Sequence, residues 1–118
     1  MKILFFVFTL LCSLPAKDTL TGRWESKPSE KGNVTGVLFK PDHSLLGYVN
    51  KKPFATGTYT FNPKDSILSF VDNGCNAVQG VYKVLFFGSS DSLKFQVITD
   101  SCEERKNGMQ RLVLGRVK

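Results

Sequence analysis

Histidine is almost absent from this chain of 118 residues, which contains only His43. His43 stands in the run Pro41-Asp42-His43-Ser44, whose residue types are typical of a turn. A Ser-His-Asp or Cys-His catalytic set needs a histidine as its base. Because the single candidate base lies in a short turn, the sequence predicts that the protein is not an enzyme and that it needs no cofactor.

Long hydrophobic runs are lacking too. The apolar run from Ile3 to Leu11 is too short to span a bilayer as a helix. It follows Lys2 and precedes the small residue Ala16, which is the arrangement of a secretory signal peptide. We therefore predict a signal peptide over residues 1–16 and a mature chain without a transmembrane helix.

The mature chain, residues 17–118, has the size of one domain. A signal peptide predicts an extracytoplasmic protein, either periplasmic or secreted. An alternative starts from Cys12, which follows the apolar run as the acylated cysteine of a lipoprotein does. Lipidation of Cys12 would anchor the protein to a membrane.

No segment is dominated by charge of one sign. The chain has 16 Lys and Arg against 10 Asp and Glu, but these residues are scattered, which is typical of a solvated surface. Nucleic-acid binders instead show clustered basic residues, often interleaved with aromatic ones. We predict no nucleic-acid partner, whereas attraction to acidic proteins or anionic surfaces remains open.

Cysteine is limited to three residues, and removal of the signal peptide leaves Cys75 and Cys102. An even number of cysteines in an oxidising compartment predicts one disulfide. Two thiols without a cluster of His or Asp do not make a zinc site, and their wide separation is unlike a CxxC redox pair. We therefore expect a structural bond and no metal.

No stretch of the mature chain keeps a helical period. Segments rich in β-branched and aromatic residues alternate with clusters of Gly, Pro, Asn, Asp and Ser. This pattern predicts an all-β fold, namely an eight-stranded antiparallel up-and-down barrel with one disulfide. The similar segments 57–70 and 80–95 predict a hairpin unit that is used twice. The expected strands are Leu20 to Lys27, Val34 to Lys40, Leu45 to Asn50, Ala55 to Asn62, Ser66 to Asp72, Val78 to Phe87, Leu93 to Thr99 and Gln110 to Val117.

The connections distinguish the two ends of the expected barrel. Short turns at 41–44, 63–65 and 88–92 mark a closed end, and longer connections mark a mouth. Cys75 and Cys102 both fall in mouth connections, so the topology allows them to meet. Alternation along the strands predicts these inward side chains: Trp24, Phe39, Tyr59, Phe61, Leu68, Phe70, Tyr82, Val84, Leu93, Phe95, Val97, Leu112 and Leu114.

The first expected strand opens with Leu20-Thr21-Gly22-Arg23-Trp24, which resembles the Gly-x-Trp signature of lipocalins and other calycin barrels. In that family an Arg of the last strand lies over the Trp. The resemblance therefore implies that Arg116 contacts the ring of Trp24 at the closed end, in a cation–π geometry.

The second half is similar to a set of small bacterial lipocalin-like exported proteins. It shares with them two Gly-x-Tyr strands, here Gly57-Thr58-Tyr59 and Gly80-Val81-Tyr82, with Cys75 between them. A late Asp-x-Cys-x-x-Arg segment follows, here Asp100 to Arg105. The resemblance implies a barrel with a disulfide.

Four aromatic residues are candidates for ligand contact, because the strand directions place them in the mouth half of the barrel. Gly57 and Gly80 lie in phase beside two of them and would leave room for a ligand. On the alternative interpretation, the glycines permit the coiling of a small barrel whose tyrosines fill it. The four candidates are Tyr48, Tyr59, Phe70 and Tyr82.

The densest charge cluster lies in the long connection before the last strand. It either braces this connection around the disulfide or forms a surface that recognises a protein. Its members are Asp100, Glu103, Glu104 and Arg105.

These features favour a non-enzymatic, lipocalin-like protein that binds a small, partly hydrophobic molecule at the barrel mouth. The alternative is a protein–protein module, such as a periplasmic or secreted inhibitor of proteases or lysozymes. The lining of the barrel interior distinguishes the two hypotheses.

Overall fold

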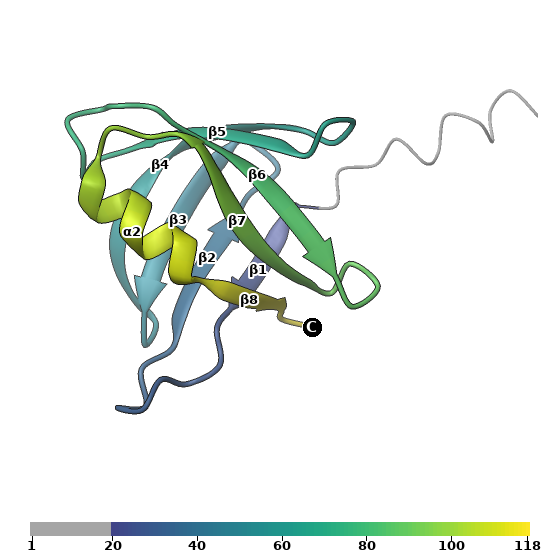
Figure 1. Ribbon diagram of the computed structural model, residues 1–118. Coiled ribbons are helices and arrows are strands. Elements are labelled where there is room, and N and C mark those ends of the chain that lie inside the picture. Colours follow the sequence, from purple (N-terminus) through teal and green to yellow (C-terminus); the bar gives the residue numbers. More distant parts are fainter. Residues whose placement is uncertain (1–19) are drawn as a thin grey trace, which may run out of the picture.

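The computed structural model describes residues 20–118, so the predicted signal peptide, its cleavage site and Cys12 lie outside the described residues. The predicted fold is confirmed: eight antiparallel strands form a closed barrel in which each strand pairs with its neighbours in sequence and β8 pairs with β1 (Figure 1). The elements are β1 (Gly22–Glu25), β2 (Thr35–Phe39), β3 (Ser44–Val49), β4 (Lys52–Asn62), β5 (Ile67–Asp72), β6 (Gly80–Phe87), β7 (Ser92–Thr99), α2 (Glu103–Arg111) and β8 (Val113–Arg116).

The inner face of the barrel is made by the residues that the alternation predicts. Every predicted inward side chain belongs to one apolar cluster or packs against it, because successive side chains of a strand point to opposite faces. Leu45 joins this cluster, so β3 turns its odd-numbered residues inward. The two predicted hairpins are present as the pairs β4–β5 and β6–β7.

The helix α2 differs from the sequence-based expectation, which had no helix and began the last strand at Gln110. In the structure Gln110 and Arg111 end the helix, and β8 begins at Val113. The segment buries none of its residues and contains Gly108, so it shows neither an apolar stripe nor strong helix propensity. Its first turn carries Glu103 and Glu104, which favour a helix N-terminus.

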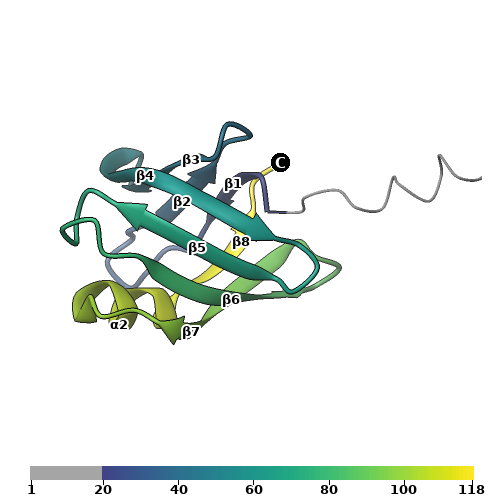
Figure 2. The same ribbon diagram turned by 90° about the horizontal axis from the view of Figure 1, so that it is seen from above.

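The two ends of the barrel are as predicted. The turn between β4 and β5 and the turn between β6 and β7 lie at the right of Figure 1, and α2 lies at the opposite end with the connection between β5 and β6. Figure 2 shows the same separation from above. The predicted disulfide joins Cys75 and Cys102 at the mouth, with 2.05 Å between the sulfurs.

At the closed end, Trp24 is fully buried and its Nε1 donates to the Leu20 carbonyl at 2.9 Å. The guanidinium of Arg116 lies 4.2 Å from the centre of the Trp24 ring, which confirms the predicted contact. Gly22 has a φ of +133°, and a Cβ there would lie 3.2 Å from Nη1 of Arg116. The residues of the first and last strands therefore close the barrel together.

Among residues 20–118, no helix has the length and apolar character needed to cross a membrane.

Candidate functional site

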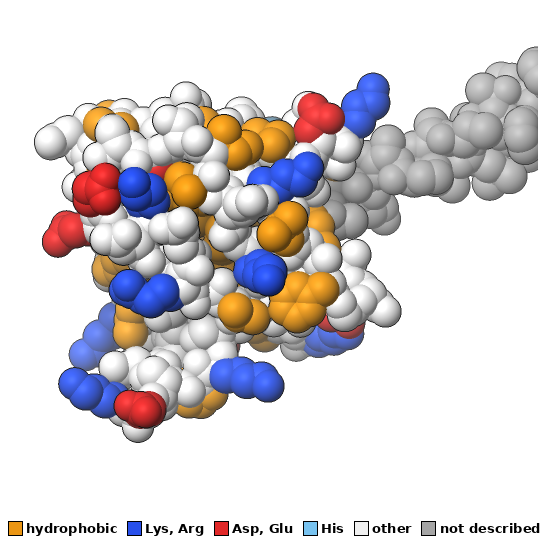
Figure 3. Space-filling model, viewed as in Figure 1, with side chains coloured by type: hydrophobic (Ala, Val, Ile, Leu, Met, Phe, Trp, Pro, Cys, Tyr) orange, Lys and Arg blue, Asp and Glu red, His pale blue; other side chains and the backbone are white. Residues whose placement is uncertain are grey.

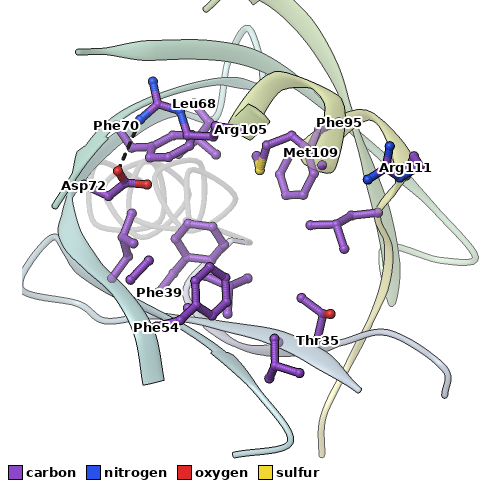
Figure 4. A pocket seen from close by; sticks show the side chains of 18 of the residues that line it. Thr35, Phe39, Phe54, Leu68, Phe70, Asp72, Phe95, Arg105, Met109 and Arg111 are labelled. Carbon is purple, nitrogen blue, oxygen red and sulfur yellow. Dashed lines mark hydrogen bonds and ion pairs between the residues drawn. The ribbon is translucent and has the colours of Figure 1, made fainter. Parts of the chain in front are cut away.

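A cavity of about 430 Å³ occupies the mouth half of the barrel, between the inner faces of the strands and α2 (Figure 4). Exposed residues such as Phe54 and Arg111 take part in its lining, so the cavity reaches the surface. Its wall is made by these residues: Thr35, Gly36, Val37, Phe39, Leu45, Gly47, Val49, Phe54, Ala55, Leu68, Phe70, Asp72, Phe95, Glu104, Arg105, Gly108, Met109, Arg111 and Leu112.

Most of this wall is apolar. Phe39, Leu45 and Leu68 come from three different strands and are buried members of the core cluster. From α2, Met109 packs against this cluster and points into the cavity. Strand residues two positions apart, such as Leu45, Gly47 and Val49, reach the cavity because the strands alternate inward and outward. From α2, the side with Glu104–Arg105, Gly108–Met109 and Arg111 faces it.

One part of the wall is charged. Asp72, at the end of β5, and Arg105, on α2, face each other with 3.4 Å between Oδ1 and Nη1. The side chains of Asp72 and Arg105 are 11% and 7% exposed, respectively. The guanidinium of Arg105 also lies over the ring of Phe70, at 4.9 Å. A ligand in the cavity would therefore meet one polar corner beside an aromatic ring.

Behind this corner, Asp100 lies fully buried and holds Arg105 in place. Arg105 donates from Nε and Nη2 to the two carboxylate oxygens of Asp100, both at 2.8 Å, and Nη2 also donates to the Val78 carbonyl at 2.9 Å. Asp100 further accepts from the Tyr82 hydroxyl and from the Cys102 amide. This network ties α2 to β6 and to the disulfide.

Burial acts to raise the pKa of the Asp100 carboxyl, but hydrogen bonds from Arg105, Tyr82 and the Cys102 amide outweigh it and hold that pKa below its usual value. Burial and the neighbouring carboxylate raise the pKa of the Tyr82 phenol. The hydrogen bonds to Asp100 raise the pKa of Arg105. Asp100 is therefore ionised near neutral pH, and Tyr82 keeps its proton.

Of the four aromatic candidates, only Phe70 lines the cavity. The predicted position of Tyr48 inside the mouth is wrong. Tyr48 stands opposite Gly36 on the outer face of the sheet, where its hydroxyl donates to Glu25 at 2.5 Å and Arg23 lies over its ring. The bulge between Gly47 and Tyr48 interrupts the pairing of β3 with β4 at this point.

The other two tyrosines are inside the barrel but do not line the cavity. Tyr59 points towards the closed end, where its hydroxyl donates to the Lys40 carbonyl at 2.7 Å. Tyr82 turns its hydroxyl to Asp100 instead of to open space. The space beside Gly80 is likewise taken, because a Cβ there would lie 2.9 Å from Asp100 and 3.0 Å from Arg105.

The charge cluster divides into two parts. Asp100 and Arg105 form the buried pair that braces the connection around the disulfide. Glu103 and Glu104 are exposed, and Glu104 lies at the edge of the cavity. Figure 3 shows that basic and acidic side chains are interspersed on the face that carries α2, with apolar side chains between them.

Asp72 and Phe54 line the wall but were not predicted to do so. Asp72 was detectable, because it continues the inward alternation of Leu68 and Phe70 by two more residues. Phe54 was not, since it is 62% exposed and belongs to the part of β4 that precedes the predicted strand. His43 is an exposed turn residue at the closed end, as predicted, and lies away from the cavity.

Within residues 20–118, no group of His, Cys, Asp and Glu side chains is arranged to hold a metal ion. No protein-family model, curated protein or solved structure matches this chain. Membership of the lipocalin-like family therefore stays a prediction.

Proposed function

We propose that this protein is an extracytoplasmic binding protein that takes up a small, mostly apolar molecule in the mouth half of its barrel. The observation that carries the proposal is the cavity of about 430 Å³ with an apolar wall and one charged corner. Ligand pockets in proteins typically have about 300–1,000 Å³, an apolar lining and a few polar groups that orient the ligand.

The positions of the polar groups support a binding role. The deep wall, with Phe39, Leu45 and Leu68, would remove the apolar part of a ligand from water, at about 25 cal/mol per Å² of buried apolar surface. Asp72 lies at the end of β5, opposite Arg105 on α2. A polar end of the same molecule would lie beside these two residues.

The disulfide supports the extracytoplasmic part of the proposal. Bonds such as Cys75–Cys102 form and persist in oxidising compartments and are rare in the cytosol. The Trp24–Arg116 contact at the closed end is the feature that the lipocalin resemblance implies, and we propose membership of that group on this basis.

A neutral fluorescent probe, N-phenyl-1-naphthylamine, tests the binding function. The cavity would bind it with a rise in emission. Replacing Gly47 and Gly108 by Leu adds two side chains to the wall, from β3 and α2, and should abolish this rise. Neither glycine has a positive φ, and an added Cβ meets no atom closer than 3.5 Å.

The matched control replaces exposed Thr60 and Gln110 by Leu, one on a strand and one on the same helix. This variant should bind the probe as the wild type does. Equal binding by the Gly47→Leu/Gly108→Leu variant, or no probe binding by the wild type, would contradict the proposal. The second result would favour the alternative of a protein–protein module.

A further inference from the structure

We propose that the cavity selects amphipathic molecules that carry a protonated amine, and that Asp72 binds this ammonium group. This inference rests on the proposed function, because it names the chemical class of the molecule in the same cavity. It follows from the balance of charge at the polar corner and from the aromatic rings around it.

The polar corner and the Asp100 side chain behind it together contain two carboxylates and one guanidinium. Arg105 is committed to Asp100, with two hydrogen bonds of 2.8 Å and a side chain of Asp100 that is 0% exposed. Asp72 reaches Arg105 only at 3.4 Å, beyond the usual range for a charge-assisted hydrogen bond. The excess negative charge of the group is therefore that of Asp72.

Asp72 also has an unused acceptor. Its Oδ1 accepts from the Gly74 amide at 2.9 Å and faces Arg105. Its Oδ2 accepts no hydrogen bond from any residue in the range 20–118. Figure 4 shows the carboxylate of Asp72 projecting from the wall into the cavity. The Asp72 side chain is only 11% exposed, and at a site with little water a carboxylate oxygen gains much from a charged donor.

The rings near Asp72 suit a cation as well. Four phenylalanines line the cavity, and the faces of aromatic rings attract cations. The ring of Phe70 already carries the guanidinium of Arg105 at 4.9 Å. Of the other three rings, Phe39 and Phe54 lie nearer to Asp72 than Phe95, which lies beside Met109 across the cavity (Figure 4).

An anionic head group finds no comparable site. Nη1 of Arg105 is the nitrogen that makes no hydrogen bond to Asp100, and it faces Asp72. A ligand carboxylate that approached Nη1 would therefore be repelled by the negative charge of Asp72. Arg111 lines the opposite side of the cavity and is exposed, where charge is screened by water and salt. The corner therefore distinguishes an amine from an acid with the same chain.

Competition against the fluorescent probe tests this selectivity. Decylamine, decanol and decanoate share one alkyl chain and differ in head group. The two charged compounds are titrated near pH 7 below their micelle concentrations, and decanol below its solubility limit. We expect the affinity of the wild type for decylamine to be about tenfold higher than that for decanoate. The reason is that decylamine gains a charge-assisted hydrogen bond to Asp72, whereas decanoate is repelled by it.

Asp72→Asn keeps the shape of the side chain and removes its charge. It should bring the affinity for decylamine close to that for decanol and leave the affinity for decanol unchanged. The control Asp65→Asn removes the same charge from an exposed turn at the closed end and should keep the preference for the amine. Thermal unfolding of each variant shows whether it is folded during the titration.

The outcomes separate this inference from the proposed function. Displacement by all three compounds with decanoate equal to or tighter than decylamine overturns the selectivity and leaves the binding function standing. If the Asp72→Asn variant still prefers decylamine to decanol as the wild type does, Asp72 is not the residue that binds the ammonium group. Failure of all three compounds to displace a bound probe contradicts the selectivity alone, whereas failure of the wild type to bind the probe contradicts both proposals. The ranking in the wild type does not depend on the folding of any variant.

Discussion

Asp100 accepts hydrogen bonds from three different partners: the hydroxyl of Tyr82, the side chain of Arg105 and the amide of Cys102. A buried carboxylate is costly unless its charge is paired and its oxygens are satisfied. Here both conditions are met, so the residue contributes stability only in its ionised form. Its protonation state is therefore linked to folding.

The first prediction concerns acid. Because the folded state holds the pKa of Asp100 below its usual value, its contribution is fully present above the unfolded-state pKa, about 3.9, and is lost as the pH falls further. We expect the free energy of unfolding of the wild type to drop below about pH 4. In Asp100→Asn this drop should be smaller, and stability near pH 7 should be lower by about 3 kcal/mol.

Urea unfolding at a series of pH values, followed by tryptophan fluorescence, measures both effects. Asp65→Asn, which changes an exposed carboxylate, should keep the slope of the wild type. The same acid slope in wild type and Asp100→Asn would show that the pair with Arg105 is not linked to folding.

At the scale of elements, α2 is the part of the molecule whose position depends most on contacts with other elements. It buries no residue of its own, yet it forms one wall of the cavity. Two attachments hold its beginning, the disulfide at Cys102 and the ion pair of Arg105 with Asp100. The position of this wall therefore depends on covalent and ionic contacts more than on packing.

The second prediction follows from the disulfide. Cys75→Ser/Cys102→Ser removes a bond across a sequence separation of 27 residues and should lower the free energy of unfolding by about 3.5 kcal/mol. Hydrogen exchange of the α2 amides should become faster than that of the β6 and β7 amides. Reduction of the wild type with a thiol should give the same pattern, and unchanged exchange in α2 would contradict the role assigned to the bond.

Most of the strands could be predicted from sequence because they leave a period of two, and the barrel follows from eight short strands joined in sequence order. The helix could not, since its stability comes from Cys102 and Arg105 and not from an apolar stripe. Long-range partners of this kind leave no local pattern.

The candidate site shows the same limit. Alternation placed Phe70 on the cavity wall, because inward direction is a local property of a strand. It misplaced Tyr48, next to the bulge between β3 and β4. The space expected beside Gly80 is occupied by Asp100, a residue 20 positions away in sequence.

At the scale of the whole molecule, closure of the barrel depends on its shortest pairing. β1 and β8 pair at Trp24 with Arg116 and at Glu25 with Gly115, whereas β6 and β7 pair along nearly their full lengths. Arg116 adds its cation–π contact and a hydrogen bond of 3.2 Å to the Thr21 carbonyl. Side-chain contacts therefore supplement a short ladder at this junction.

The third prediction tests that junction. Arg116→Met should lower the free energy of unfolding by about 1–2 kcal/mol, because it removes the contact with Trp24 and the hydrogen bond to the backbone. Lys83→Met removes the same charge from an exposed position on β6 and should have little effect. Guanidinium unfolding followed by circular dichroism measures both, and equal stabilities of the two variants would contradict this role of Arg116.

The only tryptophan of the chain lies at the closed end and takes no part in the cavity wall. Its emission therefore reports the packing of one end of the barrel, while an added dye reports the occupancy of the other. A ligand should change the dye signal and leave the wavelength of the tryptophan emission unchanged, whereas unfolding should change both. The emission of Trp24 is thus an internal standard. In a single sample it distinguishes a variant that no longer binds the ligand from a variant that is unfolded.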